Sequence, residues 1–306
     1  MKNKIFLLSS LLLVGSLSFS KDFNVSPDII EEDIYVKNNI FKEISIGQTL
    51  EIDNRSGGDN IGESVIFMNE VVLSTENWDY KVAGGVVFSS DTDDLYKNGN
   101  ARMELEAIRA FNNGYLGGRW RAEDDYNRFY LRSGYNKGMF SGWLDAQYWS
   151  FNDPSTEQDK IEIEVMPLNI DFGFIAVGYY LDYIKYSGRG TQYDDSNTAL
   201  LEEVTYHQIR AYIPLYDEGK LSLDLEYRLG LHMNKDFNES TPYRVHKDFQ
   251  NNILILNANY AMTDSLDLFG YYRYDINNYK EKDGNYSKLN NGKYYGEFFI
   301  GWEYSF

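Results

Sequence analysis

The chain has 306 residues, no cysteine, and 47 acidic residues against 29 basic ones, which gives a formal net charge of −18. This acidity argues against nucleic acid and against anionic membrane surfaces as partners. The lack of cysteine excludes disulfides, thiolate catalysis, a lipoprotein anchor and cysteine-ligated zinc. The 27 Tyr and 18 Phe beside only 5 Pro favour β-structure.

Residues 1–20 have the pattern of a secretory signal peptide. Lys2 and Lys4 precede an apolar run from Ile5 to Val14, and cleavage is predicted after Ser20. The run is too short for a helix that spans a bilayer, and a buried N-terminal helix is the alternative. Without the two lysines the mature chain keeps 27 basic and 47 acidic residues, a net charge of −20. We expect an acidic periplasmic leader over 21–41, with an interaction arm as the alternative, and a barrel over 42–306.

The segments after this leader alternate apolar and polar residues with the period of a β-strand. In the clearest one, the leucines from Leu221 to Leu231 alternate with polar residues that end at His232. The last strand ends on Phe306, which is typical of outer-membrane barrels and predicts recognition by the barrel-assembly machinery. We predict fourteen strands, at 42–53, 61–74, 77–89, 100–112, 115–124, 126–136, 138–151, 160–167, 170–186, 200–214, 218–233, 250–262, 265–277 and 293–306.

The connections between these strands alternate between tight and long. Most of the tight ones contain the Gly, Asn or Asp that turns require, and the fourth of them is placed at Leu168-Asn169. Long extracellular loops, short periplasmic turns and termini on the turn side define an outer-membrane barrel. Asp124-Asp125 is short where a long loop is expected, so the loop is truncated or the barrel has twelve strands. A soluble β-sandwich fits less well, because its inward positions would be apolar.

Charged residues occupy one face of many predicted strands, and we expect this face to line an aqueous lumen. Four of the arginines lie on two adjacent strands and should form one basic wall; the alternative is that the charges only pair and hydrate the lumen. The candidate lumen residues are Arg102, Arg119, Arg121, Arg128, Arg132, Arg210, Arg228, Arg273, Asp145, Glu162, Glu164, Asp224, Glu226, Asp267, Glu297 and Glu303.

Aromatic residues are expected in two places. Those on the apolar faces would form interfacial girdles, and these are Tyr179, Tyr183, Tyr272, Tyr274, Trp302 and Tyr304. Those that share parity with charges could form a stacking track for sugars, and these are Trp143, Trp149, Phe269 and Phe299. The chain has three histidines and no Gly-x-Ser-x-Gly or His-Glu-x-x-His motif. His207, on the apolar parity, is the one candidate for a catalytic base, and an interfacial role for it is the stronger interpretation.

The sequence resembles the outer-membrane protein G type of monomeric, fourteen-stranded porin. The resemblance is carried by HQIRAYIPL at 207–215 and RLGLHM at 228–233, with weaker fragments in the same order along nearly all of the mature chain. It implies a single-chain channel that admits mono-, di- and small oligosaccharides with little specificity. In that family a long loop closes the pore at acidic pH, beside a histidine pair. The corresponding loop is 234–249, where His246 and Asp248 are the candidate gating residues and the partner histidine is missing from 277–282.

Together these observations predict a passive outer-membrane channel for small hydrophilic solutes such as sugars and ions, in a Gram-negative-type bacterium. We expect a monomer embedded in outer-membrane lipids, with no enzymatic activity, no cofactor and no metal. Two alternatives remain open. One is a porin for acidic oligosaccharides of the oligogalacturonate type, which the basic wall would suit. The other is a non-conducting barrel that acts as an adhesin or tether through its extracellular loops.

Overall fold

The computed structural model describes residues 41–54, 64–89, 99–153, 158–187, 201–237, 243–244, 248–249, 251–276, 278–280, 286–288 and 296–306. The predicted signal peptide, nearly all of the predicted leader and His246 lie outside these residues. No helix in the described part of the chain is long and apolar enough to cross a membrane.

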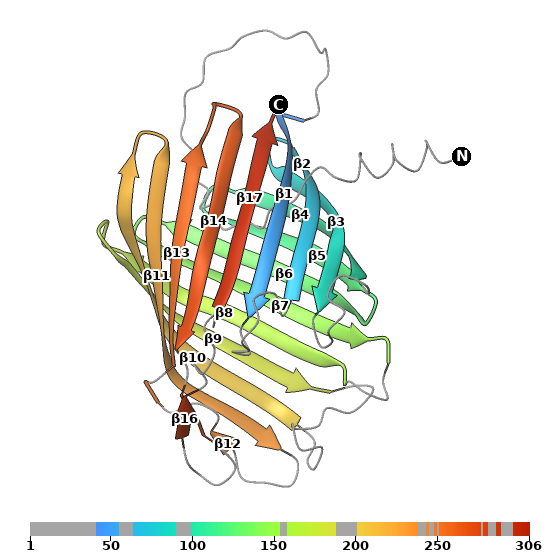
Figure 1. Ribbon diagram of the computed structural model, residues 1–306, viewed down its shortest axis with the longest axis vertical. Coiled ribbons are helices and arrows are strands. Elements are labelled where there is room, and N and C mark those ends of the chain that lie inside the picture. The colour runs from blue at the N-terminus through green and yellow to red at the C-terminus, as the bar shows by residue number, and fades with distance from the viewer. Residues whose placement is uncertain are drawn as a thin grey trace.

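The structure is a closed antiparallel barrel of fourteen strands (Figure 1). The strands are β1 (Glu43–Asn54), β2 (Ser64–Ser74), β3 (Trp78–Ser89), β4 (Gly99–Phe111), β5 (Gly114–Glu123), β6 (Tyr126–Lys137), β7 (Phe140–Phe151), β8 (Lys160–Asp171), β9 (Ala176–Tyr186), β10 (Leu201–Glu218), β11 (Leu221–Phe237), β13 (Asn251–Ala261), β14 (Leu266–Ile276) and β17 (Gly296–Ser305). β1 pairs with β17 and closes the ring. Three short strands lie outside it: β12 (Tyr243–Arg244), which pairs with β11, and β15 (Asn278–Lys280) and β16 (Tyr286–Lys288), which pair with each other.

The predicted fold class, fourteen strands and not twelve, is confirmed. Six connections of two to four residues and both ends of the barrel lie at one end, which we call the turn end; the opposite end is the loop end (Figure 1). The loop at Asp124-Asp125 is truncated, and its backbone carbonyls accept hydrogen bonds from Asn152, from the side chain to Asp124 at 2.6 Å and from the backbone N–H to Asp125 at 2.8 Å. Five of the six predicted turns are in place, and the turn at Leu168-Asn169 is wrong.

The strand β8 continues past the predicted turn because it contains a bulge. Its register with β9 shifts between Val165 and Leu168, so that Pro167 occupies an irregular position, which accommodates its missing N–H. The true turn follows at 172–175, where Gly173 adopts a φ of +86° and its N–H donates to the Asp171 carboxylate at 2.7 Å. Glycine takes this left-handed conformation without steric cost.

The alternation of side chains divides the barrel wall into two faces. Residues of one parity include large apolar side chains that remain exposed, such as Val82 at 53 % and Leu131 at 53 %. Residues of the other parity include buried charges, such as Glu70, Lys81 and Glu104. Because the sheet is closed, the charged parity faces the interior and the apolar parity faces outward. The predicted girdle tyrosines Tyr179, Tyr272 and Tyr304 are on the outward parity and exposed.

One bulge reverses the parity predicted for the end of β11. Gln208 pairs with Gly230, whereas His207 pairs with His232, so that Leu231 is an extra residue on β11. His232 therefore lies on the outward face beside His207, and the prediction that its parity matches that of the inward polar residues is wrong. Strict alternation fails here because an extra residue shifts the side-chain register by one.

Candidate pore-lining site

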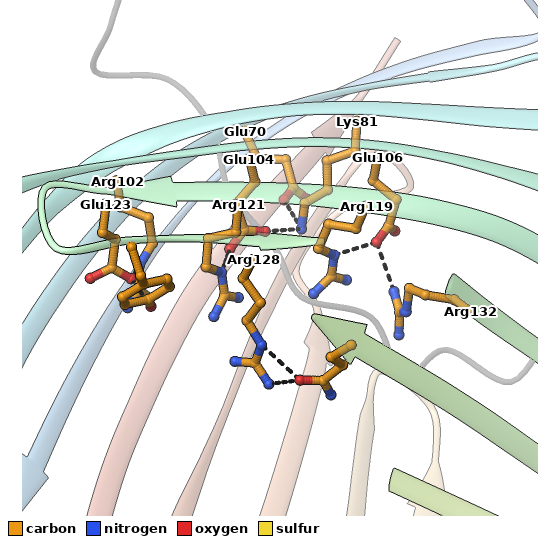
Figure 2. A network of polar contacts seen from close by, with 12 residues as sticks. Glu70, Lys81, Arg102, Glu104, Glu106, Arg119, Arg121, Glu123, Arg128 and Arg132 are labelled. Atoms are coloured by element: carbon orange, nitrogen blue, oxygen red, sulfur yellow. Dashed lines mark hydrogen bonds and ion pairs between the residues drawn. The ribbon is translucent and has the colours of Figure 1, made fainter. Parts of the chain in front are cut away.

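The inward faces of β2 to β5 carry a continuous chain of opposite charges (Figure 2). Glu104 lies directly across from Arg121, whose Nε is 2.6 Å from its Oε1. On the other side the Nζ of Lys81 is 3.8 Å from Glu104 and also pairs with Glu70 on β2. This register places a cation between acids and an acid between cations across four strands.

A second branch of the network is centred on Glu106. It lies across from Arg119, with which it forms an ion pair. The same carboxylate oxygen is 2.8 Å from Nη1 of Arg132 on β6 (Figure 2). Arg132 also reaches Asp145 on β7 at 3.1 Å. One carboxylate thus holds two guanidinium groups against the wall, and the second of these is held from both sides.

The other predicted arginines are paired in the same manner. Each of the eight arginines predicted for the lumen has a carboxylate oxygen within 4.0 Å of one of its nitrogens. The pairs beyond the two branches are Arg102–Glu123 at 2.7 Å, Arg128–Glu162 at 3.6 Å, Arg210–Glu226 at 4.0 Å, Arg228–Glu226 at 2.6 Å and Arg273–Asp275 at 2.7 Å.

The predicted acids have several kinds of partner. Glu164 accepts hydrogen bonds from the Tyr180 hydroxyl at 2.7 Å and from the Gln147 amide at 2.9 Å. Glu297 is 3.8 Å from Arg273 and contacts the Tyr271 hydroxyl. Asp267 and Glu303 are register partners on β14 and β17. Asp224 shares the parity of Glu226 on β11 and is exposed. All of the predicted charges therefore lie on the inward parity.

The expected basic wall on β5 and β6 exists, but acids from the neighbouring strands alternate with it. The sequence prediction omitted Glu104 and Glu106 of β4, which neutralise Arg119 and Arg121. The alternation could have placed both acids on the inward face, because they share the parity of Arg102 in the segment RMELEA. What the sequence did not give was the register that places them opposite the arginines.

A group of three carboxylates occupies a different part of the wall, beside Arg273. Glu51, Asp53 and Glu297, on the adjacent strands β1 and β17, have carboxylate oxygens within 4.8 Å of one another. Together with Glu162, Glu164 and Asp182 on β8 and β9, this group leaves the lumen rich in carboxylates between its arginine-bearing sectors.

The aromatic residues of the inward face are packed against their neighbours. The ring centre of Trp149 is 3.8 Å from the guanidinium carbon of Arg128 and 4.2 Å from Nζ of Lys160. Phe299 is only 7 % exposed and stacks on Tyr271 with ring centres 4.9 Å apart. Trp143 lies against Tyr180 at 5.9 Å, and Phe269 lies against Phe299 at 6.0 Å. These contacts do not favour the four aromatics as a sugar-stacking track.

His207 and His232 lie on the outward face, apart from this interior. His207 is on the outward parity, as predicted, and its Nδ1 is 2.6 Å from the hydroxyl of Tyr179. Asp248, one of the two candidate gating residues, is 3.0 Å from Nδ1 of His232. The sequence interpretation missed the His207–His232 neighbourhood because the bulge at Leu231 has no signal in the alternation.

The sequence matches no protein-family model and no curated protein. Among solved structures, the barrel is similar to a bacterial polysaccharide outer membrane secretin, with a TM-score of 0.50, 11% identity, and coverage of 88% of this chain and 99% of that one. Weaker similarities include the outer membrane channel DcaP of Acinetobacter baumannii, with a TM-score of 0.42, 10% identity and coverage of 88% and 96%. Another is OmpT, an outer membrane protein of Vibrio cholerae, with a TM-score of 0.43, 12% identity and coverage of 89% and 99%. The likeness is one of fold, and these neighbours are outer-membrane proteins.

Proposed function

We propose that this barrel is a passive channel in the outer membrane that conducts small hydrophilic solutes and ions, with a preference for cations. The single observation that carries the proposal is the division of a closed fourteen-strand wall into an apolar outer face and an ion-paired inner face. The apolar face of such a wall can contact lipid, and its charged face can contact water. Diffusion through it requires no catalytic group.

The size of the ring is compatible with a lumen. Strands about 4.8 Å apart and tilted by about 40° close into a fourteen-strand ring about 28 Å across between backbones. Barrels of about 8 strands are just filled by side chains, and those of 16 to 18 leave an aqueous channel. Lateral ion pairs such as Arg121–Glu104 run along the wall, from strand to strand. Arginine side chains held along the wall in this way extend less far towards the axis of the barrel than unpaired arginine side chains would.

Cation preference follows from the excess of carboxylates over basic groups on the inward face. The arginines on β4 to β6 are largely neutralised by adjacent acids, whereas Glu51, Asp53 and Glu297 form a cluster of carboxylates on β1 and β17, which β2 and β3 separate from β4. Fixed charges in a low-dielectric wall raise the local concentration of counter-ions. Because the basic wall is neutralised, a porin specific for acidic oligosaccharides is the less favoured proposal. Neutral mono- and small oligosaccharides fit the channel better.

The finer features belong to the same proposal. The turn end faces the periplasm and the loop end faces the outside, as the lengths of the connections suggest. The chain acts as a monomer, and the barrel-assembly machinery recognises Phe306. Closure of the channel by the loop 234–249 stays a prediction, and measurements of the conductance of the barrel at neutral and acidic pH would test it.

The test is single-channel conductance of the refolded chain from residue 21 onward in a planar bilayer, with the reversal potential measured across a salt gradient. We expect single-step openings and a reversal potential of cationic sign. Anionic selectivity would favour the acidic-oligosaccharide alternative. A correctly folded barrel without conductance would overturn the channel and favour an adhesin or tether.

A further inference from the structure

Two histidines lie side by side on the outward face of the barrel, near its loop end. His207 on β10 and His232 on β11 are register partners, and their ring centres are 6.2 Å apart. In a regular strand without this bulge, His232 would share the inward parity of Arg228 and Gly230. Bulges commonly re-aim a side chain in this way. This bulge brings a second imidazole to the first.

Both rings are oriented by a partner on the same nitrogen. Nδ1 of His207 is 2.6 Å from the Tyr179 hydroxyl, and Nδ1 of His232 is 3.0 Å from the Asp248 carboxylate. A carboxylate on Nδ1 accepts its proton and leaves the lone pair on Nε2, which is the arrangement found at metal-binding histidines. Between the described residues, the hydrogen bonds of both rings use Nδ1.

The backbone around this pair is irregular in a way that positions Asp248. The N–H of Phe249 donates to the carbonyl of Gly230 at 3.1 Å, which fixes the returning limb of the loop on the bulge. Phe249 has a φ of 59°, a conformation that non-glycine residues rarely adopt, and its side chain is 62 % exposed. A Cβ on Gly230 would lie 2.8 Å from Cβ of Asn251. Strain held by surrounding contacts in this manner is characteristic of functional sites.

We propose that His207 and His232 bind one divalent transition-metal ion, Cu²⁺ or Zn²⁺, through their Nε2 atoms, with water completing the coordination. A metal–N bond of about 2.1 Å places the ion about 3.2 Å from each ring centre, so two rings that share it have centres about 5.2 Å apart at a tetrahedral angle and at most about 6.4 Å apart when the ion lies on the line between them. The observed 6.2 Å meets this limit. Imidazole suits copper and zinc, whereas Mg²⁺ and Ca²⁺ prefer oxygen ligands.

The position along the barrel gives the ion access from water. His232 is eleven residues beyond Leu221, the first residue of β11. At a rise of about 3.3 Å per residue and a tilt of about 40°, it lies about 28 Å from the turn end, beyond an apolar band of about 25 Å. A bound ion would cross-link β10 to β11 and, through Asp248, hold the returning limb of the loop. The site does not depend on whether the barrel conducts.

The test is isothermal titration of the untagged chain from residue 21 onward with Cu²⁺ and with Zn²⁺. We expect one ion per chain, loss of at least about tenfold in affinity for His207→Ala and for His232→Ala, and about 10- to 100-fold weaker binding for Asp248→Asn. His246→Ala removes the only other histidine in the chain and is the matched control, with unchanged affinity expected. Mg²⁺ should not bind at this site.

A second measurement does not depend on the variants. Electron paramagnetic resonance of the wild-type chain with one equivalent of Cu²⁺ should show hyperfine coupling to two imidazole nitrogens. Far-ultraviolet circular dichroism shows whether each variant keeps the barrel. Equal affinity of the wild type and the folded double variant H207A/H232A would overturn the proposal. So would a copper spectrum with oxygen ligands only, or loss of binding in H246A.

Discussion

The substitution Glu106→Gln removes the one carboxylate that holds both Arg119 and Arg132. The side chains of these arginines are 11% and 15% exposed, so water replaces the lost charge only in part. Hydrogen bonds to charged groups contribute about 1.5–3 kcal/mol, and exposed ion pairs only about 0.2–1 kcal/mol. The two arginines are neither fully buried nor fully exposed, so we expect Glu106→Gln to lower the free energy of unfolding by an intermediate amount, about 2 kcal/mol.

The assay is reversible urea unfolding of the barrel in lipid vesicles, followed by tryptophan fluorescence. Glu76→Gln is the control, because Glu76 is exposed in the turn between β2 and β3. The variants Glu106→Gln, Arg132→Gln and their combination form a double-mutant cycle, and residues in contact are expected to give a coupling energy of about 0.5–3 kcal/mol. In the bilayer, Glu106→Gln should also shift the reversal potential towards anions. A coupling energy near zero together with an unchanged reversal potential would refute the reasoning.

Three further predictions concern other parts of the barrel. Replacing Gly173 by alanine should lower the free energy of unfolding by about 1 kcal/mol, measured in urea, because its φ of +86° is strained for any other residue; no change would contradict the turn geometry. Gln48→Leu should destabilise the barrel by about 1–3 kcal/mol, because on the outward face Gln48 donates to Asn69 at 3.2 Å and accepts from Trp302 at 3.3 Å. Adding Asn69→Leu should recover part of this loss in the same assay, and a larger, additive loss would argue against the network. Glu297→Gln should reduce the ratio of cation to anion permeability, read from the reversal potential, and an increase would argue against the acidic cluster as its source.

The sequence was sufficient for the fold because a barrel repeats one rule. The alternation in Leu221–Phe237 or in Lys160–Asp171 defines a strand and its two faces without reference to any other segment. The closing aromatic strand and the alternating lengths of the connections add the topology. Each of these signals is local, and together they predict the fourteen strands and the closed barrel that the structure has.

What the sequence could not supply are features created by pairing. The predicted strand 160–167 ends before a predicted turn at Leu168-Asn169, but a bulge carries the strand through Pro167 and the turn comes later, at Gly173. The extra residue Leu231 looks like one more leucine in a regular series. The neutralisation of Arg119 by Glu106 depends on the register between β4 and β5. A shift of one residue would have turned the arginines of β5 to the other face of the sheet.

The strands of the barrel wall differ in length. β5 has 10 residues and β6 has 12, whereas β10 and β11 have 18 and 17. β10 continues from its last pair with β9, Tyr212–Ala176, to Glu218 at the turn end, and β11 continues from its last pair with β13, Gly230–Asn251, to Phe237 at the loop end. The hairpin of β10 and β11 therefore projects past one neighbouring strand at each end of the barrel. Near the connection Asp124-Asp125, by contrast, Arg102 on β4 and Glu123 on β5 form an ion pair, whose nitrogen and oxygen are 2.7 Å apart.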